Sequence, residues 1–346
     1  AEKGIVAIRD FAFSSPETEI KVSGRFPLSG EPQQGVTLSG KLNLHAFEPF
    51  IPGGQLGGHI DLSTSVSGSL KKPIFSGRIR LEDVDAGFSG FPFTLEKAAG
   101  RIILDSGTIR LENFSGGIGE GKIDASGQLN LPGLSAAAPP QGKNQFDIQW
   151  AGLNPSAFDR FLPPEYSGRL QGDISGSASI SGDFSSLASI SIQGRFNRFR
   201  MELTPFEMAA ENDILFSMSN GRFQLQPMHL SGSQSAIRAQ GSLDFQQENP
   251  RLASSLSVSL DGGALSPLIE SALFSGTAAL DLALNGPVDN PVITGQGTLK
   301  DFYLQLQSLP LTISNIEGDI RFSESQIDIS SIKGSANGGP VSLGGQ

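Results

Sequence analysis

The sequence has no cysteine, and its 346 residues include only one tryptophan, two tyrosines and three histidines. Without cysteine the chain can form neither a disulfide nor a thiolate metal site. The histidines, His45, His59 and His229, lack the spacing of a metal-binding motif, so we expect no metal site and no cofactor. No apolar run in the sequence is long enough to span a bilayer.

Positive charge is also scarce. Lysine and arginine together number 25 against 35 acidic residues, which gives a net charge of −10 and a pI near 4.9. An acidic surface repels phosphates, so we expect no nucleic-acid partner and no flat binding to an anionic membrane. The opening AEKGIVAIRD is not a signal peptide. If the natural protein is exported or anchored, we expect the responsible segment to lie outside this chain.

Motifs that carry catalytic chemistry are missing as well. GGIGEG (116–121) has no strand–helix unit around it and reads as a tight turn rather than a phosphate cradle. LEDVDAG (81–87) gathers three acids, but the matching LKDFYLQ (299–305) keeps only Asp301, which favours a solvated strand edge over a calcium site. No G-x-S-x-G motif occurs, and no acidic pair shares an evident pocket. We therefore expect that the protein is not an enzyme.

What the sequence does have is glycine, proline and phenylalanine, with 43, 21 and 23 residues, and a hydrophobic fraction of 38 %. Apolar residues alternate with polar ones, as in 60–66, 109–112, 302–307 and 327–329. A period of two predicts strands with one apolar and one polar face. Turn signals such as SG, DSG and NG separate these segments, which favours antiparallel strands joined by short turns.

The chain repeats itself. GSLKKPIFSGRIRLED (68–83) matches GPVDNPVITGQGTLKD (286–301) without a gap, and this offset of 218 residues holds from about Leu42 to the end. A middle copy matches at an offset of 114 apart from one three-residue excursion near Gly194, and the tail of the unit occurs four times. Such periodicity is typical of solenoids and domain arrays. We divide the chain into the tail of a preceding repeat (1–40), repeat 1 (41–145), repeat 2 (146–250) and a truncated repeat 3 (251–346).

Two irregular features recur within the unit. The apolar phase slips between Leu81 and Val84 and again between Leu299 and Phe302, which predicts a β-bulge at the same place in both copies. Each unit also has one candidate for a short helix: 154–164, 266–276 and, with two prolines, the shorter 47–54. We therefore predict an all-β, elongated repeat array: a curled, mainly antiparallel sheet with one short helix per repeat.

The pattern G-x-L-x-x-P-x-x-x-G (68–77), followed by GRIILDSGTIRLENFSG (100–116) and GEGKIDASGQLNL (119–131), resembles the repeating segments of the TamB and AsmA-like proteins of the Gram-negative envelope. Successive copies extend this resemblance over essentially the whole chain. It implies a U-shaped apolar trough, of the kind called a β-taco, in a periplasmic body held by an inner-membrane anchor. It further implies a role in phospholipid movement toward the outer membrane or in outer-membrane protein assembly, and an outer-membrane barrel partner that binds through regions outside this chain.

The sequence leaves open what covers the apolar face. Alternation alone favours closed β-sandwiches with a filled core, whereas the repeat and the resemblance favour an open groove that binds lipid. The candidate groove residues are the inward aliphatic, methionine and phenylalanine side chains of the strands: Ile60, Leu62, Val66, Ile79, Leu81, Ile102, Leu104, Ile109, Leu111, Ile174, Phe199, Met201, Leu203, Phe216, Met218, Leu280, Leu282, Leu284, Phe302, Leu304, Ile320, Phe322, Ile327 and Ile329.

Our leading hypothesis is that the chain is a monomeric segment of a longer periplasmic conduit that shields phospholipid acyl chains between the inner and outer membranes. The alternatives are a spacer or stalk of closed β-sandwich repeats, and an assembly factor that offers a strand edge to outer-membrane proteins.

Overall fold

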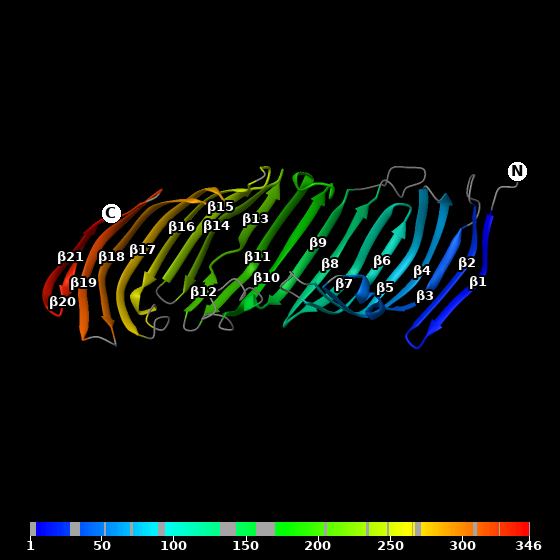
Figure 1. The fold of residues 1–346 in the computed structure, drawn as a ribbon, viewed down its shortest axis with the longest axis horizontal. Coiled ribbons are helices and arrows are strands. Elements are labelled where there is room, and N and C mark those ends of the chain that lie inside the picture. Colours follow the sequence, from blue (N-terminus) through cyan, green and yellow to red (C-terminus); the bar gives the residue numbers. More distant parts are fainter. Residues whose placement is uncertain are drawn as a thin grey trace. The chain divides into compact units, whose positions relative to one another are not determined.

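A computed structural model of the chain shows long antiparallel strands that follow one another in a meander (Figure 1). The described residues include 21 strands. The predicted fold class, an all-β curled array with a mainly antiparallel sheet, is therefore confirmed. The structure describes residues 5–27, 35–51, 53–69, 72–88, 94–131, 143–156, 170–203, 206–232, 235–247, 249–264, 266, 271–306, 310–324 and 326–345.

The strands are long, and several have more than ten residues. Their bounds are β1 Ile5–Ser15, β2 Thr18–Pro27, β3 Val36–Asn43, β4 Gly54–Ser69, β5 Lys72–Phe88, β6 Thr94–Asp105, β7 Thr108–Ile118, β8 Gly121–Asn130, β9 Gln145–Leu153, β10 Leu170–Gly182, β11 Ile190–Leu203, β12 Phe206–Ala210, β13 Ile214–Ser219, β14 Arg222–Gly232, β15 Ser235–Asp244, β16 Arg251–Asp261, β17 Ala272–Pro287, β18 Val292–Leu306, β19 Leu311–Ser323, β20 Gln326–Ala336 and β21 Gly339–Gly345. Among the described residues, 3₁₀ helices are formed by η1 Leu44–Phe50, η5 Leu187–Ser189 and η6 Gly262–Ala264, and residues 155–156 also have 3₁₀ conformation.

The chain divides into two compact units. Unit 1 comprises 1–157 and 177–184, and contains β1 to β9 and the end of β10. Unit 2 comprises 158–176 and 185–346, and contains the start of β10 and β11 to β21. Within each unit the pairing is local, because most strands pair with the next strand in the sequence. The exception is in unit 2, where β12 and β13 both lie between β11 and β14 and act as one interrupted strand. The proposed repeat boundaries stay a prediction.

The sequence repeat has a structural counterpart. β4 and β17 are both 16-residue strands, and β7 and β20 are both 11-residue strands, each pair being separated by the offset of 218 residues. A register shift occurs between Leu81 and Val84, and another between Leu299 and Phe302, so the predicted bulges are confirmed in both copies.

A glycine–aspartate contact explains why this part of the repeat is so constant. Asp83 and Asp301 lie at the two bulges, both with φ 48°, a left-handed conformation that aspartate tolerates better than most residues. On the neighbouring strand, a Cβ at Gly58 or Gly276 would collide with the carbonyl oxygen of Asp83 or Asp301 respectively. The close backbone approach at each bulge therefore requires glycine on one strand and a residue that accepts positive φ on the other.

Two-residue turns close several hairpins, as the turn signals predict. Ser106 and Gly107 join β6 to β7 with φ values of 45° and 94°, and Asn220 and Gly221 join β13 to β14 with 51° and 67°. Positive φ at both central positions is the type I′ geometry, which matches the twist of the flanking strands.

The helix predictions are partly wrong. In the candidate 266–276, residues 272–276 belong to β17, because the alternation of Ala272 and Phe274 continues across Gly276 and pairs with β18; 267–270 lie outside the described residues. In 154–164, Asn154 Oδ1 accepts a hydrogen bond from the Ser156 amide at 3.0 Å, as a helix cap would, but 157–164 also lie outside them. The candidate 47–54 overlaps η1, a 3₁₀ helix rather than an α-helix.

Candidate functional site

In unit 1 the strand register gathers the apolar side chains on one face of the sheet. Residues directly opposite each other in an antiparallel pair point to the same side, so the register defines rows that cross the strands. One row crosses β1 to β9 without interruption, and a second crosses β1 to β8. The first is Phe13, Ile20, Gly40, Leu62, Ile79, Ile102, Leu111, Gly127 and Phe146, and the second is Phe11, Val22, Leu38, Thr64, Gly77, Leu104, Ile109 and Leu129.

Unit 2 has the same arrangement on β14 to β20. One row is Leu230, Ile237, Val258, Leu280, Gly297, Ile320 and Ile329, and the next is Met228, Ala239, Leu256, Leu282, Gly295, Phe322 and Ile327. Each unit therefore presents an apolar face built from several strands, rather than scattered apolar positions.

The predicted groove residues lie on these faces. In unit 1 the register places all nine of them on the apolar face, and in unit 2 it does so for the residues from Phe216 to Ile329. Met201 pairs with Met208 on the same side, and Phe199 packs nearby. Ile174 of β10 is buried, with 8 % exposure, whereas Ile327 near the start of β20 is 55 % exposed. The side chain of Leu203 lies outside the described residues.

Several members of the apolar faces are absent from that prediction. Ile20 and Leu38 of unit 1, and Leu256 and Val258 of unit 2, lie in the same rows, and Leu42 lies on the same face opposite Ile60. The signal was present in the sequence, because RLASSLSVSL (251–260) alternates as strictly as the predicted segments.

Large side chains fill the space above glycines in the rows. A Cβ at Gly297 would lie 3.4 Å from Leu280 Cδ1 and 3.7 Å from Phe322 Cε2. The Phe146 ring lies against Gly127 and the Phe216 ring against Gly194 in the same way. Glycine and a large neighbour thus form one continuous apolar surface, an arrangement that also stabilises strand glycines.

These faces are only partly covered. Leu256, Leu280, Leu282 and Leu284 are neither buried nor fully exposed, although they lie in the middle of long strands. In a closed sandwich such positions pack against a second sheet about 10 Å away and lose nearly all contact with water. The partial exposure is what a single layer with a curved, unfilled apolar face produces.

One part of unit 2 is packed more tightly. Met208, Ile214 and Leu230 are 5 %, 2 % and 3 % exposed. We call them and the partly buried residues around them the Met208 cluster, which adds Phe196, Phe199, Ala210, Leu225, Met228 and Ile237. Aromatic contacts run through it and beyond, with ring centroids 5.2 Å apart for Phe196 and Phe216 and 6.1 Å for Phe216 and Phe223.

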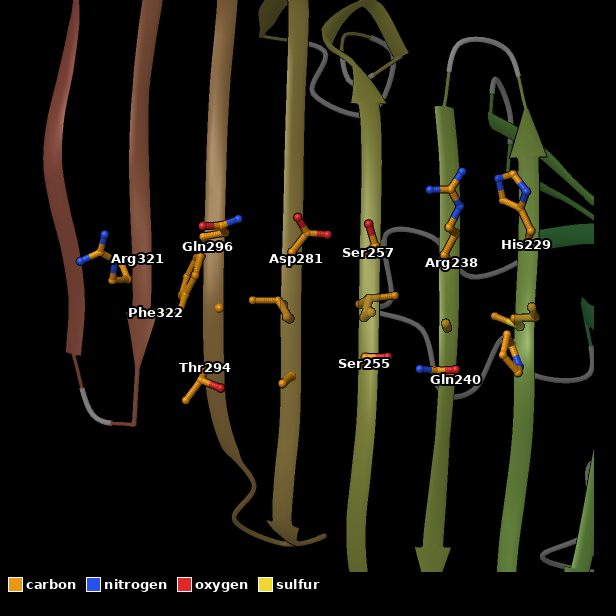
Figure 2. A pocket seen from close by; sticks show the side chains of 17 residues that line it. His229, Arg238, Gln240, Ser255, Ser257, Asp281, Thr294, Gln296, Arg321 and Phe322 are labelled. Atoms are coloured by element: carbon orange, nitrogen blue, oxygen red, sulfur yellow. The ribbon is translucent and has the colours of Figure 1, made fainter.

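The opposite face of unit 2 is polar. A hollow of about 800 Å³ over β14 to β19 is lined by polar residues of that face and by members of the apolar row, among them Met228, Leu282 and Phe322. Figure 2 shows one row of its lining side chains on neighbouring strands: His229, Arg238, Ser257, Asp281, Gln296 and Arg321. His229 Nδ1 lies 2.7 Å from Glu211 Oε2 at one end of this row. A smaller hollow of about 390 Å³ in unit 1 is also lined by polar residues, among them Arg110, Gln128 and Asp147.

Two of the three acidic residues in LEDVDAG (81–87), Asp83 and Asp85, help to fix the local backbone. Asp83 occupies the bulge, and Asp85 Oδ1 accepts a hydrogen bond from the Lys97 amide at 2.8 Å. Among the described residues no group of three or more His, Asp or Glu side chains is arranged to hold a metal ion. The pKa of Lys21 is raised because its ammonium group donates a hydrogen bond to the Glu19 carboxylate and is attracted by its charge.

Within the described part of the chain, no helix has the length and hydropathy needed to cross a membrane. Comparison with known proteins adds no relative: no family, no curated protein and no solved structure matches this chain. The fold and the two apolar faces are therefore the basis of the functional argument.

Proposed function

We propose that the apolar face of each unit shields the acyl chains of phospholipids, and that the chain is a segment of a periplasmic conduit between the inner and outer membranes. The observation that carries this proposal is the combination of continuity and partial exposure. The rows cross many neighbouring strands, yet mid-strand leucines such as Leu280 and Leu282 stay accessible.

The free-energy cost that such a surface avoids is large. Moving one sixteen-carbon acyl chain into water costs on the order of 13 kcal/mol, at about 0.8 kcal/mol per CH₂ group. An apolar face removes most of that cost wherever the chain lies against it. Shielding needs no catalytic group, only aliphatic and aromatic side chains in an unbroken series.

The side chains in these rows suit a hydrocarbon chain that slides along the face better than one that is bound tightly at a single place. Their members are mainly leucine, isoleucine, valine, phenylalanine and glycine, with few polar exceptions such as Thr64. Charged side chains such as Arg238 and Asp281 belong to the alternate positions and point to the other face. A hydrocarbon chain on the apolar face therefore meets no fixed charge in these rows.

A spacer built of closed β-sandwiches fits the observations less well. Such a spacer needs a filled core, and the mid-strand leucines of β16 and β17 would then be buried. They keep partial exposure instead, and the strands of each unit belong to one meandering layer.

Photocrosslinking tests the proposal directly. A benzophenone amino acid is placed at Leu282 on the apolar face or, as a matched control, at Ser255, which pairs with Ala283 on the polar face. The protein is mixed with vesicles of phosphatidylethanolamine and phosphatidylglycerol and irradiated. We expect lipid adducts at Leu282 in about tenfold excess over Ser255, as a difference near 1.4 kcal/mol in local affinity would give. Equal adducts at both positions, or none at Leu282, would reject the proposal.

A charge substitution on the apolar face provides a second test of the proposal. Leu282→Asp combined with Leu304→Asp should abolish the adducts formed from a benzophenone at Leu280 while the strand signal in circular dichroism stays unchanged, because a carboxylate on an open face remains hydrated. If the double variant unfolds instead, the two leucines belong to a packed interior and the groove does not exist.

A further inference from the structure

The hollow over β14 to β19 is separate from the proposed lipid surface, because it opens on the other face of the sheet. Its lining includes Asp281 and Ala283, the two neighbours of Leu282 that alternate to the polar face. The next residues of the apolar face on the same strand, Leu280 and Leu284, do not line it. The floor of the hollow is therefore the backbone of the strands, and side chains of the polar face form its walls.

Two rows of polar-face residues border this floor. The strand register places the members of each row directly opposite one another on neighbouring strands. The first row is His229, Arg238, Ser257, Asp281, Gln296 and Arg321, and the second is Gln240, Ser255, Ala283 and Thr294 (Figure 2). Apart from Ala283, every member can donate or accept a hydrogen bond. The hollow thus offers a hydrogen-bonding side chain on each strand that it crosses.

Three charged side chains of the first row, those of Arg238, Asp281 and Arg321, make no ion pair or hydrogen bond within the described part of the chain. By contrast, every arginine of β11 has an acidic partner: Arg195 with Asp213, Arg198 with Asp173 and Arg200 with Glu207. The chain has 35 acidic and 25 basic residues, so a shortage of carboxylates does not explain the two unpaired arginines. Both guanidinium groups are therefore available to an anionic ligand.

The repeat does not explain these residues either. At the offset of 218 residues, the last three members of the first row correspond to residues of a different kind: Asp281 to Ser63, Gln296 to Arg78 and Arg321 to Ile103. The three counterparts pair with one another in unit 1 as the three residues do in unit 2. The same strand arrangement therefore forms without this acid, this amide and this guanidinium, and the lining of the hollow is particular to unit 2.

The dimensions of the hollow suit an extended ligand. Its volume of about 800 Å³ lies within the range of about 300–1,000 Å³ that is typical of small-molecule sites. It crosses β14 to β19, and at about 4.8 Å from strand to strand it is roughly 24 Å long. A linear glycan advances by about one strand spacing per sugar ring. Successive hydroxyl groups of such a ligand would therefore meet hydrogen-bonding side chains of successive strands.

Other elongated ligands fit less well. An acyl chain would remove water from the hydrogen-bonding side chains and give nothing in return. A single nucleic-acid strand binds through several cations and through aromatic side chains that stack on its bases, and the lining offers only Phe322 and the imidazole of His229 for stacking. An extended peptide adds to a free strand edge, whereas β15 to β18 are paired on both sides.

We infer that this hollow binds a linear acidic oligosaccharide, which lies across β14 to β19 with about one ring over each strand. Arg238 and Arg321, four strands apart, bind anionic groups of the sugar through charge-assisted hydrogen bonds. Asp281 and the glutamines between them bind its hydroxyl groups. The site lies on the face opposite to the lipid surface and does not depend on lipid binding.

A matched pair of hexasaccharides tests the role of charge. A mannuronate hexamer and a mannose hexamer with the same β linkage differ only in a carboxylate or a hydroxymethyl group on each ring. Binding of each to the full chain is measured by isothermal titration calorimetry. We expect the mannuronate hexamer to bind about tenfold more tightly, because its carboxylates form charge-assisted hydrogen bonds with the guanidinium groups.

Arginine substitutions test the two ends of the site. Arg238→Gln combined with Arg321→Gln removes both guanidinium groups and keeps polar side chains. The affinity for the mannuronate hexamer should fall about tenfold, and that for the mannose hexamer should stay within about twofold. Arg78→Gln combined with Arg251→Gln is the control, because it removes the same charge at exposed strand positions outside the lining. We expect this control to bind both hexamers as the parent chain does.

A steric substitution tests the hollow itself. Ala283→Tyr places a large side chain between Ser255 and Thr294, across the middle of the site, and should abolish binding of both hexamers. Ala279→Tyr lies on the same strand and face but outside the lining, and should leave binding unchanged. Circular dichroism checks that every variant keeps its strand signal.

Several results would overturn the inference. They are no binding of the mannuronate hexamer, equal affinity for the two hexamers, or equal losses in the hollow variants and their controls. A thymidylate hexamer supplies the last comparison. If it binds as tightly as the mannuronate hexamer and loses affinity in the same variants, the hollow is an unselective anion site and the assignment to an oligosaccharide is wrong.

Discussion

Two regions of unit 2 use the same apolar face differently. In the Met208 cluster, on β11 to β15, Ile214 and Leu230 are almost fully buried. On β16 to β19, the leucines of the neighbouring rows stay partly exposed. Both regions are antiparallel strands of one meander, so strand pairing does not cause the difference.

Side-chain size and a local break explain the contrast. The strand opposite β11 is interrupted between β12 and β13, and phenylalanine and methionine side chains gather around that break. Long and aromatic side chains reach one another across several strands and exclude water. In the middle of β16 and β17 the apolar side chains are leucine, valine and alanine, which extend less far, so the face stays open there. Near the start of β17 the Phe274 ring contacts that of Phe302, with centroids 6.0 Å apart. A single-layer sheet can thus be anchored by a local cluster and still leave an accessible surface beside it.

The largest difference between the two regions should appear in the free energy of unfolding when an apolar side chain is shortened to alanine. Ile214→Ala removes buried methyl and methylene groups at a site with 2 % exposure, and should lower the free energy of unfolding by about 3 kcal/mol. Leu282→Ala in the open region should cost only about 1 kcal/mol, because part of that side chain already contacts water. Urea denaturation followed by circular dichroism measures both, and Leu282→Phe serves as a volume control. Equal losses at the two positions would mean that the open region is packed as well.

A smaller effect is expected at the bulge glycines, which both copies of the repeat share. Gly276→Ala should destabilise unit 2 by about 2 kcal/mol, because φ is +91° and the added Cβ meets the Asp301 carbonyl oxygen. Gly58→Ala should do the same in unit 1, where the contact is with Asp83.

Gly338→Ala is the control for that contact. Its φ is +87°, but a Cβ there meets nothing within 4 Å, so only the backbone strain of about 1 kcal/mol remains. Thermal melts of the three variants separate collision from strain. If Gly276→Ala behaves like Gly338→Ala, the close approach at the bulge is not what keeps glycine in the repeat.

Much of this arrangement follows from the sequence. Period-two alternation predicts the strands and their apolar face, and the phase slip at Leu81 and Leu299 predicts both bulges. These features are local, so a few residues determine them. The sandwich and the open sheet share the same alternation, however, and only the structure shows that Leu280 and Leu282 stay accessible.

Other features depend on distant residues. The Met208 cluster combines side chains from β11 to β15 that no short pattern links. The helix predicted over 266–276 fails because pairing of Phe274 with Leu304 outweighs the local capping signals of Ser266 and Gly276.

The smallest expected effect concerns charge beside the Met208 cluster. Arg195 of β11 and Asp213, which directly precedes β13, form an ion pair at 3.6 Å, with side chains 56 % and 44 % exposed. An exposed pair loses most of its Coulomb attraction to water and to side-chain entropy, so a double-mutant cycle with Arg195→Ala and Asp213→Ala should give a coupling below about 0.5 kcal/mol. The coupling is measured by urea denaturation at low and high salt. A coupling comparable to the loss in Ile214→Ala would show that the polar face also holds the cluster together, and the contrast between the two regions could then not be assigned to their apolar side chains alone.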